Sequence, residues 1–296
     1  MTGHDLPYIT YRSWLKKRFG APVHKIPLNG GFSCPNRDGV KGKDGCAFCD
    51  NSSFSPVALT GTQVLDQLRA AISRSSHSLY LPYLQPFSNT YGDVSYLKQI
   101  YEPLIHESGV IGLAIGTRPD CLPQEVVTYL GELSRRTYLS IELGLQSASD
   151  EVLSTIRRAH SYDDFLHAVR ALDAVGIETV AHVMFGLPGQ TSEMILDMAD
   201  KLAALPVAGV KIHQLMIIEG TQVADWYRTG AIAPLTLEEY AERVAAFLRH
   251  LRPDQLIHRI MADSRPEHGL IAPLWSARKS ESIRYIQDFI KKSARI

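Results

Sequence analysis

Short apolar runs rich in β-branched residues alternate along the chain with longer amphipathic segments. Nearly continuous apolar runs of this length are typical of strands buried on both faces of a sheet. Their alternation with helical patterns predicts repeated β–α–β units and a parallel sheet covered by helices. The expected strands are 23–28, 79–85, 110–116, 138–144, 179–185 and 210–216, and the expected helices are 62–75, 94–106, 124–135, 162–175 and 193–205.

Six units of this kind fit a partial (β/α)6 barrel of the TIM type. Two helix starts agree with it, because Ser161-x-x-Asp164 and Thr236-x-x-Glu239 match a capping box or its acidic variant. A doubly wound Rossmann sheet is the alternative fold, but no Gly-x-Gly-x-x-Gly follows the first strand. The pattern therefore favours the barrel.

The chain shows no linker rich in Gly, Pro or Ser and no internal repeat. We therefore expect one domain over residues 1–296, with a barrel core of about 20–220 and a C-terminal extension of about 221–296. Within the extension, 255–263 has the pattern of a late strand. The sequence carries no signal for an oligomeric state.

Composition indicates an enzyme-sized globular protein without a strong overall field. The 296 residues are 45% apolar, enough for a full core, and Lys plus Arg equals Asp plus Glu at 31 each. Any nucleic-acid site must therefore be a local patch. The stretch 1–11 lacks the features of a signal peptide, and no run approaches the length of a membrane span. We expect a cytoplasmic protein with reduced thiols and no membrane association.

Three cysteines are grouped in one short segment, CPNRDGVKGKDGCAFC, as Cys34, Cys46 and Cys49. Thiolates suit zinc, Cu(I) and iron–sulfur clusters, and a Cys-x-x-Cys turn places two sulfurs on one ion or cluster face. Zinc requires a fourth ligand, for which His24 and Asp50 are candidates, but neither completes a paired zinc knuckle. The grouping indicates a cluster with one iron open to an exogenous ligand, with zinc and fortuitous thiols as alternatives.

The cysteine segment resembles the radical S-adenosylmethionine (radical SAM) superfamily, in which three cysteines hold a [4Fe–4S] cluster and S-adenosylmethionine (SAM) chelates the fourth iron. Phe48 matches the aromatic residue between the last two cysteines of that family. The first gap of eleven residues is longer than the commonest spacing and is similar to the branch around the Elongator catalytic subunit, above all its small YhcC/YtqA-type proteins. The resemblance implies the cluster and SAM as cofactors.

Polar residues at the C-terminal ends of barrel strands converge on one site. After the second strand, the resemblance assigns Gln85, Thr90 and Tyr91 to the cofactor. Glu142 stands inside an apolar run, so it must be paired or hydrogen-bonded, and its Glu-x-Gly-x-Gln-Ser segment resembles the family strand that faces the cofactor. A salt bridge within the barrel is the alternative role. Arg158, in a segment similar to the Asn-Arg-Gly-His of the branch, is the candidate for the SAM carboxylate.

The later strands supply further candidates. Gly186 begins a Gly-x-Pro-Gly turn that lets backbone approach a ligand, and the resemblance places adenine near it. Lys211 and His213 share one face of the sixth strand and are our candidate catalytic residues if that face is inward, although a lone histidine is often structural. The segment 117–120 should lie at the barrel mouth. Cys121 is best interpreted as a buried small residue.

The resemblance implies an enzyme that cleaves SAM reductively and starts radical chemistry on a substrate. Because the branch works on tRNA, the C5 side chain of a wobble uridine is the leading substrate, with flavodoxin or ferredoxin as electron donor. A small-molecule or peptide substrate is one alternative, and a non-catalytic iron–sulfur or zinc binding protein is another. Basic residues near both ends would make a phosphate-binding rim if they share a face. These are Lys16, Lys17, Arg18, Lys25, Arg37, Lys41, Lys43, Arg278, Lys279, Arg284, Lys291, Lys292 and Arg295.

Overall fold

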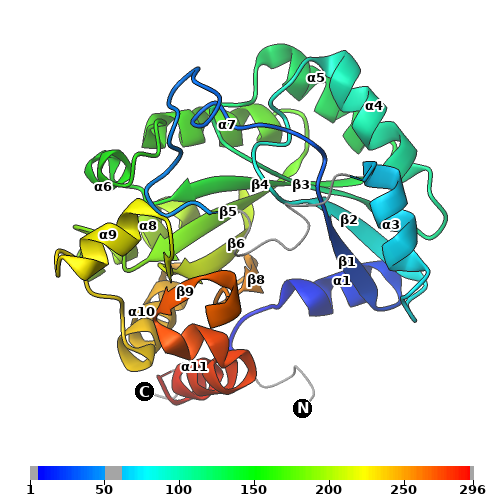
Figure 1. Cartoon of the computed structure of the whole chain (residues 1–296). Helices are drawn as coiled ribbons and strands as arrows, with labels where there is room; N and C mark the ends of the chain where they lie inside the picture. Colours follow the sequence, from blue (N-terminus) through cyan, green and yellow to red (C-terminus); the bar gives the residue numbers. More distant parts are fainter. Residues whose placement is uncertain (1–5, 51–61, 294–296) are drawn as a thin grey trace.

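Seven parallel strands form one curled sheet in the order β1-β2-β3-β4-β5-β6-β8 (Figure 1). The structure is a computed structural model that describes residues 6–50 and 62–293. The sheet is the partial TIM-like barrel that the alternating pattern predicts, so the fold prediction is confirmed. Its strands are β1 Val23–Leu28, β2 Leu79–Leu84, β3 Gly112–Thr117, β4 Tyr138–Gln146, β5 Glu178–Phe185, β6 Val207–Gln214 and β8 Leu256–Arg259.

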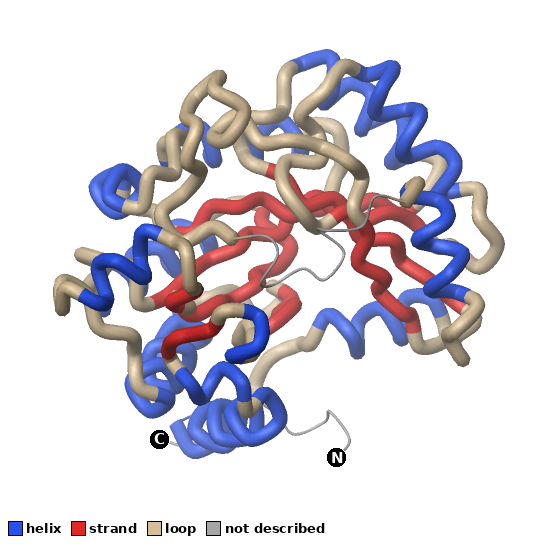
Figure 2. Tube along the Cα trace, viewed as in Figure 1, coloured by secondary structure: helices blue, strands red, loops and turns tan. Residues whose placement is uncertain are grey.

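Helices cover the outer face of this sheet (Figures 1 and 2). The two expected capping boxes are both present, at Ser161 and at Thr236, where each side chain accepts from the backbone three residues later. The helices are α1 Tyr11–Phe19, α3 Val64–Ile72, α4 Val94–Ile105, α5 Gln124–Ser134, α6 Asp150–Thr155, α7 Tyr162–Asp173, α8 Ser192–Ala203, α9 Gln222–Arg228, α10 Leu237–His250 and α11 Lys279–Ser293.

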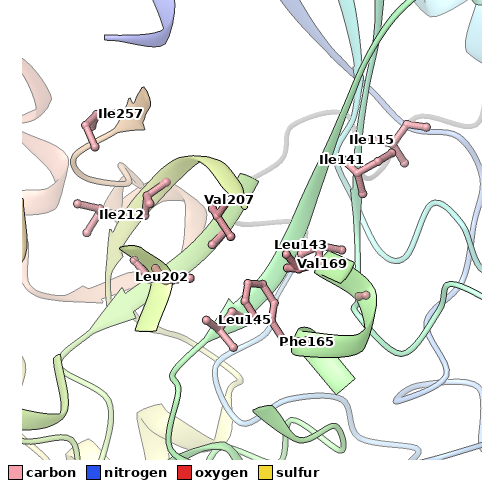
Figure 3. Packing of buried hydrophobic residues seen from close by; sticks show 14 of the residues in the cluster. Ile115, Ile141, Leu143, Leu145, Phe165, Val169, Leu202, Val207, Ile212 and Ile257 are labelled. Carbon is pink, nitrogen blue, oxygen red and sulfur yellow. The ribbon is translucent and has the colours of Figure 1, made fainter. Parts of the chain in front are cut away.

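The two-residue period of β4 separates the core from the barrel interior. Ile141, Leu143 and Leu145 are fully buried and pack toward Phe165 and Val169 of α7 (Figure 3). The alternate residues of the same strand therefore point into the barrel. Strand pairing and hydrophobic burial together fix which side chains can meet in its interior.

Helix α1 lies at the open side of the curled sheet, between β1 and β8 (Figures 1 and 2). The backbone amide of Ile257 donates to the carbonyl of Ile9 at 2.9 Å, and the Tyr11 ring stacks on the His258 ring at a centroid distance of 3.7 Å. The apolar pattern did not predict this helix, whose last turn carries Lys16, Lys17 and Arg18.

The C-terminal part of the chain completes the barrel. The expected late strand is β8, which pairs with β6 and makes the sheet one strand wider than the six units predicted. Helix α11 packs against α10, and β7 Ile217–Ile218 pairs antiparallel with β9 Leu270–Ala272. These short strands and α11 were not predicted. Within residues 6–50 and 62–293, no helix is long and apolar enough to cross a membrane.

Candidate functional site

A cavity of about 440 Å³ opens at the C-terminal ends of the strands. The cysteine loop after β1 forms one part of its lining, and inward-facing residues of β4, β5, β6 and β8 form another. The structure thus brings together most of the residues that the sequence singled out. Those lining the cavity are Cys34, Cys46, Phe48, Cys49, Gln85, Glu142, Arg158, Lys211 and His213.

The cysteine loop is held by backbone hydrogen bonds at both of its turns. The amides of Arg37 and Asp38 donate to the Cys34 carbonyl at 2.8 and 3.1 Å, and the amide of Cys49 donates to the Cys46 carbonyl at 3.0 Å. Ala47 ties the second turn to the body of the protein, because its amide donates to the Ile156 carbonyl and its own carbonyl accepts from Val223. The Cys-x-x-Cys turn is therefore fixed in place against α6 and α9.

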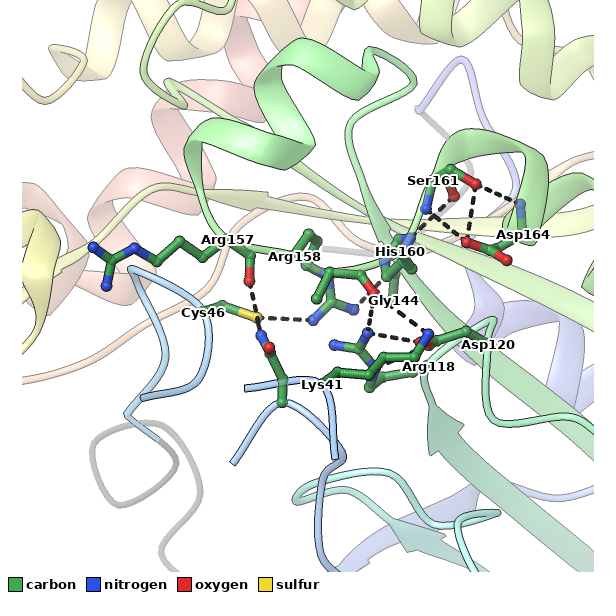
Figure 4. Close-up of polar contacts among 12 residues, drawn as sticks. Lys41, Cys46, Arg118, Asp120, Gly144, Arg157, Arg158, His160, Ser161 and Asp164 are labelled. Carbon is green, nitrogen blue, oxygen red and sulfur yellow. Dashed lines mark hydrogen bonds and ion pairs between the residues drawn. The ribbon is translucent and has the colours of Figure 1, made fainter. Parts of the chain in front are cut away.

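The surroundings of Cys46 suit a metal-bound thiolate. Its sulfur accepts from Arg158 Nη1 at 3.2 Å and from Asn36 Nδ2 at 3.5 Å (Figure 4). N–H donors to cysteine sulfur are a means by which proteins tune iron–sulfur clusters. Burial and the neighbouring Cys46 raise the pKa of the Cys49 thiol to about 11. A bound metal centre offsets this effect because its positive charge deprotonates coordinating thiols.

The donor set fits an iron–sulfur cluster, in which each cysteine ligates a different iron and the sulfurs need not converge on one point. In the described part of the chain, no group of three or more His, Cys, Asp or Glu side chains is arranged to hold a metal ion directly. His24, one of the candidates for a fourth zinc ligand, lies at the opposite end of β1 from the loop and hydrogen-bonds Ser75 at 3.0 Å.

Arg158 lies between the cysteine loop and β4. Its Nη2 donates to the Gly144 carbonyl at 2.6 Å, while its Nε is buried without a hydrogen-bond partner (Figure 4). A Cβ on Gly144 would stand 2.6 Å from this guanidinium, so the glycine makes room for it. Arg157, with a φ of 54°, turns its own side chain away from the site (Figure 4). The segment therefore presents one arginine to the cavity.

Arg118 and Asp120, expected at the mouth, link β3 to the cysteine loop. Both contacts from the Arg118 guanidinium to the Asp120 carboxylate are 2.9 Å long, and Lys41 of the loop pairs with the same carboxylate (Figure 4). Burial alone would raise the pKa of Asp120, but the hydrogen bonds from Arg118 and Lys41 lower it to about 2. This ion pair keeps the loop against the end of the sheet.

Glu142 is the centre of a buried polar network inside the barrel. Its carboxylate pairs with Lys25, with Lys211 at 2.8 Å, and with His182 at 2.7 Å, and its side chain has no exposed surface. Burial raises the pKa of a carboxyl, but Lys211 and Lys25 outweigh this and hold the pKa of Glu142 well below its usual range. The sequence-based requirement for a partner is met by three basic side chains.

Lys211 and His213 both face the cavity, as their alternation on β6 allows. Lys211 Nζ also donates to the Tyr83 hydroxyl at 2.9 Å, and burial lowers its pKa to about 7 although Glu142 opposes the shift. Arg259 Nη2 donates to the His213 ring, 2.8 Å from Nε2. Burial and Arg259 together lower the pKa of His213 well below its usual value, so this imidazole is neutral.

Three predicted cofactor residues lie outside this cavity. The Thr90 hydroxyl contacts Thr117 Oγ1 at 2.6 Å, and Thr90 and Tyr91 line a different hollow beside α7. Gly186 has a φ of 85°, and a Cβ there would stand 3.1 Å from Leu235, so this turn requires glycine. Cys121 is buried, and burial raises the pKa of its thiol to about 12, which agrees with its interpretation as an inert small residue.

Sequence reasoning missed Tyr83, Lys25 and Arg259 as site residues. Lys25 was assigned to a surface rim, but its amine is inside the barrel on Glu142. Arg259 ends β8, where a charged residue after an apolar strand is the same signal that singled out Glu142. Arg295 of the proposed rim lies outside the described residues. Lys25 is therefore removed from the proposed rim.

The chain matches the family model for the Radical SAM superfamily over residues 34–202 and that for the Radical SAM C-terminal domain over 207–292. It is 37% identical over 279 residues to YtqA of Bacillus subtilis, covering 93% of this chain and 86% of YtqA. Its identity to YhcC of Escherichia coli is 35% over 263 residues, covering 88% of this chain and 85% of YhcC.

The chain is also similar, at lower identity, to a tRNA-modifying enzyme and to a solved structure. A tRNA uridine(34) acetyltransferase of Methanocaldococcus infernus is 30% identical over 146 residues, covering 48% of this chain and 27% of that enzyme. The solved structure of Elp3 from the same archaeon, without its first residues, superposes with a TM-score of 0.66 at 18% identity and covers 90% of this chain and 63% of that one. At this identity the superposition bears on the fold alone.

Proposed function

The chain belongs to the radical SAM superfamily, which uses a [4Fe–4S] cluster and SAM, and we propose that it cleaves SAM at the cavity described above and starts radical chemistry there. The observation that carries this proposal is the convergence of Cys34, Cys46, Cys49 and Arg158 on one cavity at the C-terminal edge of a parallel sheet. Strand ends of this kind are where barrel enzymes assemble their sites.

Cys34, Cys46 and Cys49 would hold the cluster. When bound there, the cluster supplies the electron that breaks a carbon–sulfur bond of SAM. Arg158 is suited to orient the carboxylate of SAM, because it lies 3.2 Å from the Cys46 sulfur and keeps an unpaired buried Nε. Phe48 and Gln85 complete the cofactor side of the cavity lining.

Lys211, which lines the same cavity, is our candidate for proton transfer to or from the substrate. Its amine lines the cavity, and a pKa of about 7 lets it gain or lose a proton near neutral pH. Glu142 acts as a positioning residue, since it holds Lys211 at 2.8 Å. His213 is neutral and, with Arg259, would position the substrate.

Formation of 5′-deoxyadenosine from SAM tests the first part of the proposal. Anaerobically reconstituted, dithionite-reduced protein should produce it, and Cys34→Ala, Cys46→Ala and Cys49→Ala should each abolish the product. Continued cleavage by any of these variants would overturn the assignment of the cluster ligands. A protein that binds the cluster but never cleaves SAM would favour the non-catalytic alternative.

We propose tRNA as the substrate and the C5 side chain of a wobble uridine as the target. The support is the match to a tRNA uridine(34) acetyltransferase over 48% of this chain. Acetyl transfer is not part of the proposal, because the match covers 27% of that enzyme. Lys43 is exposed on the cysteine loop and lines a second hollow beside the mouth, where it is available to a phosphate.

The tRNA proposal is tested by binding at several salt concentrations and by mass spectrometry of tRNA nucleosides. Binding should weaken steeply with salt, and Lys43→Gln should reduce the slope of log K against log salt by about one. Arg249→Gln, at an exposed site on α10, is the matched control and should leave the slope unchanged. Absence of binding with intact SAM cleavage would favour a small-molecule or peptide substrate. A flavodoxin or ferredoxin is the proposed electron donor, to be tested by replacing dithionite.

A further inference from the structure

The cavity lining holds more basic than acidic side chains although the chain as a whole is neutral, and two of its arginines, Arg118 and Arg265, are paired with acids outside the lining. The lining includes six Arg and Lys side chains but two Asp and Glu side chains, whereas the whole chain has 31 of each class. A thiolate-bound cluster carries net negative charge and SAM net positive charge, so the two cofactors largely cancel. The basic residues are Arg37, Arg118, Arg158, Lys211, Arg259 and Arg265, and the acidic ones are Glu142 and Asp263.

The excess of positive over negative side chains is clearest at Arg259. Within residues 6–50 and 62–293, no carboxylate lies within ion-pair distance of its guanidinium, and its Nε is buried without a hydrogen-bond partner. Asp263, the nearby acid of the lining, pairs instead with Lys279 at 2.9 Å. The guanidinium contacts the His213 ring, which is neutral. A cation removed from water without a counter-charge is costly, so this position favours an anion.

Strand β6, which pairs with β8, adds further basic side chains beside Arg259. Lys211 shares the Glu142 carboxylate with Lys25 and His182, so one negative charge serves two amines. Strand pairing places Lys211 opposite Arg259, because these two residues are Cα partners between β6 and β8. His213 lies two residues after Lys211 on β6 and contacts Arg259. Three basic side chains thus face the cavity from two adjacent strands.

We propose that this wall, made of Lys211, His213 and Arg259, binds an oxyanion of the substrate, either a carboxylate or a phosphate group. A guanidinium offers two parallel donors to such a group, and the amine adds a point charge. The inference rests on the proposed function, since it places a substrate in the cavity that SAM enters. The site is separate from the one proposed for the SAM carboxylate, because Arg158 follows β4 and contacts Cys46.

The test measures thermal stabilisation of the reconstituted protein with SAM by inorganic phosphate, by acetate and by chloride at equal ionic strength. At about 50 mM, phosphate or acetate should raise the unfolding midpoint by roughly 5 °C more than chloride does. Arg259→Gln should lose this difference, and Arg249→Gln, an exposed arginine of α10, should keep it. A stronger effect of phosphate indicates a nucleotide-like substrate, and a stronger effect of acetate indicates a carboxylic acid.

Equal midpoints in phosphate, acetate and chloride would overturn the proposal, as would an undiminished shift in Arg259→Gln. If Arg259→Gln does not fold, Arg259→Lys takes its place and should keep less than half of the shift, because an amine lacks the paired donors. Formation of 5′-deoxyadenosine by the same wild-type sample is measured in parallel. Cleavage without anion stabilisation refutes the anion site alone, and anion stabilisation without cleavage refutes the proposed function alone.

Discussion

At the scale of single residues, the barrel interior depends on one carboxylate. Glu142 pairs with both Lys25 and Lys211 and accepts from His182, with no exposed side-chain surface. Burying such a group is favourable only while its partners stay in place. The network therefore links three strands of the barrel, β1, β4 and β6, and adds β5 through the histidine.

Glu142→Gln should lower the free energy of unfolding by about 3–5 kcal/mol, because the buried amine of Lys211 and the partly exposed amine of Lys25 lose their counter-charge. Denaturant unfolding of matched, cluster-free samples measures it. Glu219→Gln is the control, since Glu219 pairs with Arg228 at the surface and its loss should cost less than about 1 kcal/mol. Equal costs for the two variants would show that the interior network contributes no more than a surface pair.

His182 makes the stability of the folded protein depend on pH. Burial, reinforced by Lys211, lowers its folded-state pKa to about 4, against about 6.5 when unfolded. Between these values the unfolded chain binds the extra proton, so stability rises with pH through this window and is lost as pH falls. His182→Gln should reduce the slope by up to about 1.4 kcal/mol per pH unit.

Unfolding of cluster-free protein at several pH values from about 4 to 7 measures this slope. His167→Gln is the control, because the His167 side chain is 70% exposed on α7 and is hydrated in both states. An unchanged slope in His182→Gln would mean that this histidine is not held neutral in the folded protein.

Some residues of the site could be predicted from the sequence and others could not. The cysteine spacing and the lone Glu142 in an apolar strand are local signals, and the structure brings both to one cavity. Arg259 carries the same kind of signal, but its role depends on β8 pairing with β6, which is a long-range contact. Thr90 and Gly186 follow strands β2 and β5 but do not line the cavity. Their position after a strand could not show this, because some residues that do line the cavity also follow strands.

At the scale of elements, strands and covering helices followed from periodicity because each buries a regular apolar face. Helix α1 did not, since its burial is limited to Tyr11 and Leu15 and its last turn is basic. Its position is set by contacts with β8, far away in the chain. The short strands β7 and β9 are likewise defined by each other.

Tyr11→Ala should destabilise the protein by about 3 kcal/mol, because it removes a large buried ring from the open side of the barrel. The Tyr11 ring is 6% exposed and stacks on His258. Ile9→Ala is the control, since Ile9 is 43% exposed and keeps its backbone contact to Ile257. A cost below about 1 kcal/mol for Tyr11→Ala would mean that α1 is not a stable part of the barrel.

At the scale of the whole molecule, neutral net charge conceals an uneven distribution. The charged side chains of the cavity lining are mostly basic, so local charge rather than a global field would attract an anionic substrate. The predicted division near residue 220 stays a prediction, although the second family model begins at 207 and covers β8, which belongs to the main sheet. The fold and the three cysteines could be predicted from the sequence. The wall of Lys211, His213 and Arg259 could not, because it forms only when β8 pairs with β6.

The central claim is that Cys34, Cys46 and Cys49 hold a cluster with one iron open to SAM. Electron paramagnetic resonance of anaerobically reconstituted, dithionite-reduced protein, with and without SAM, tests it most directly. We predict a [4Fe–4S]⁺ signal that changes when SAM is added, that is lost in Cys46→Ala and that persists in the buried-thiol control Cys121→Ala. A signal indifferent to SAM, or bound zinc in place of iron, would contradict the account.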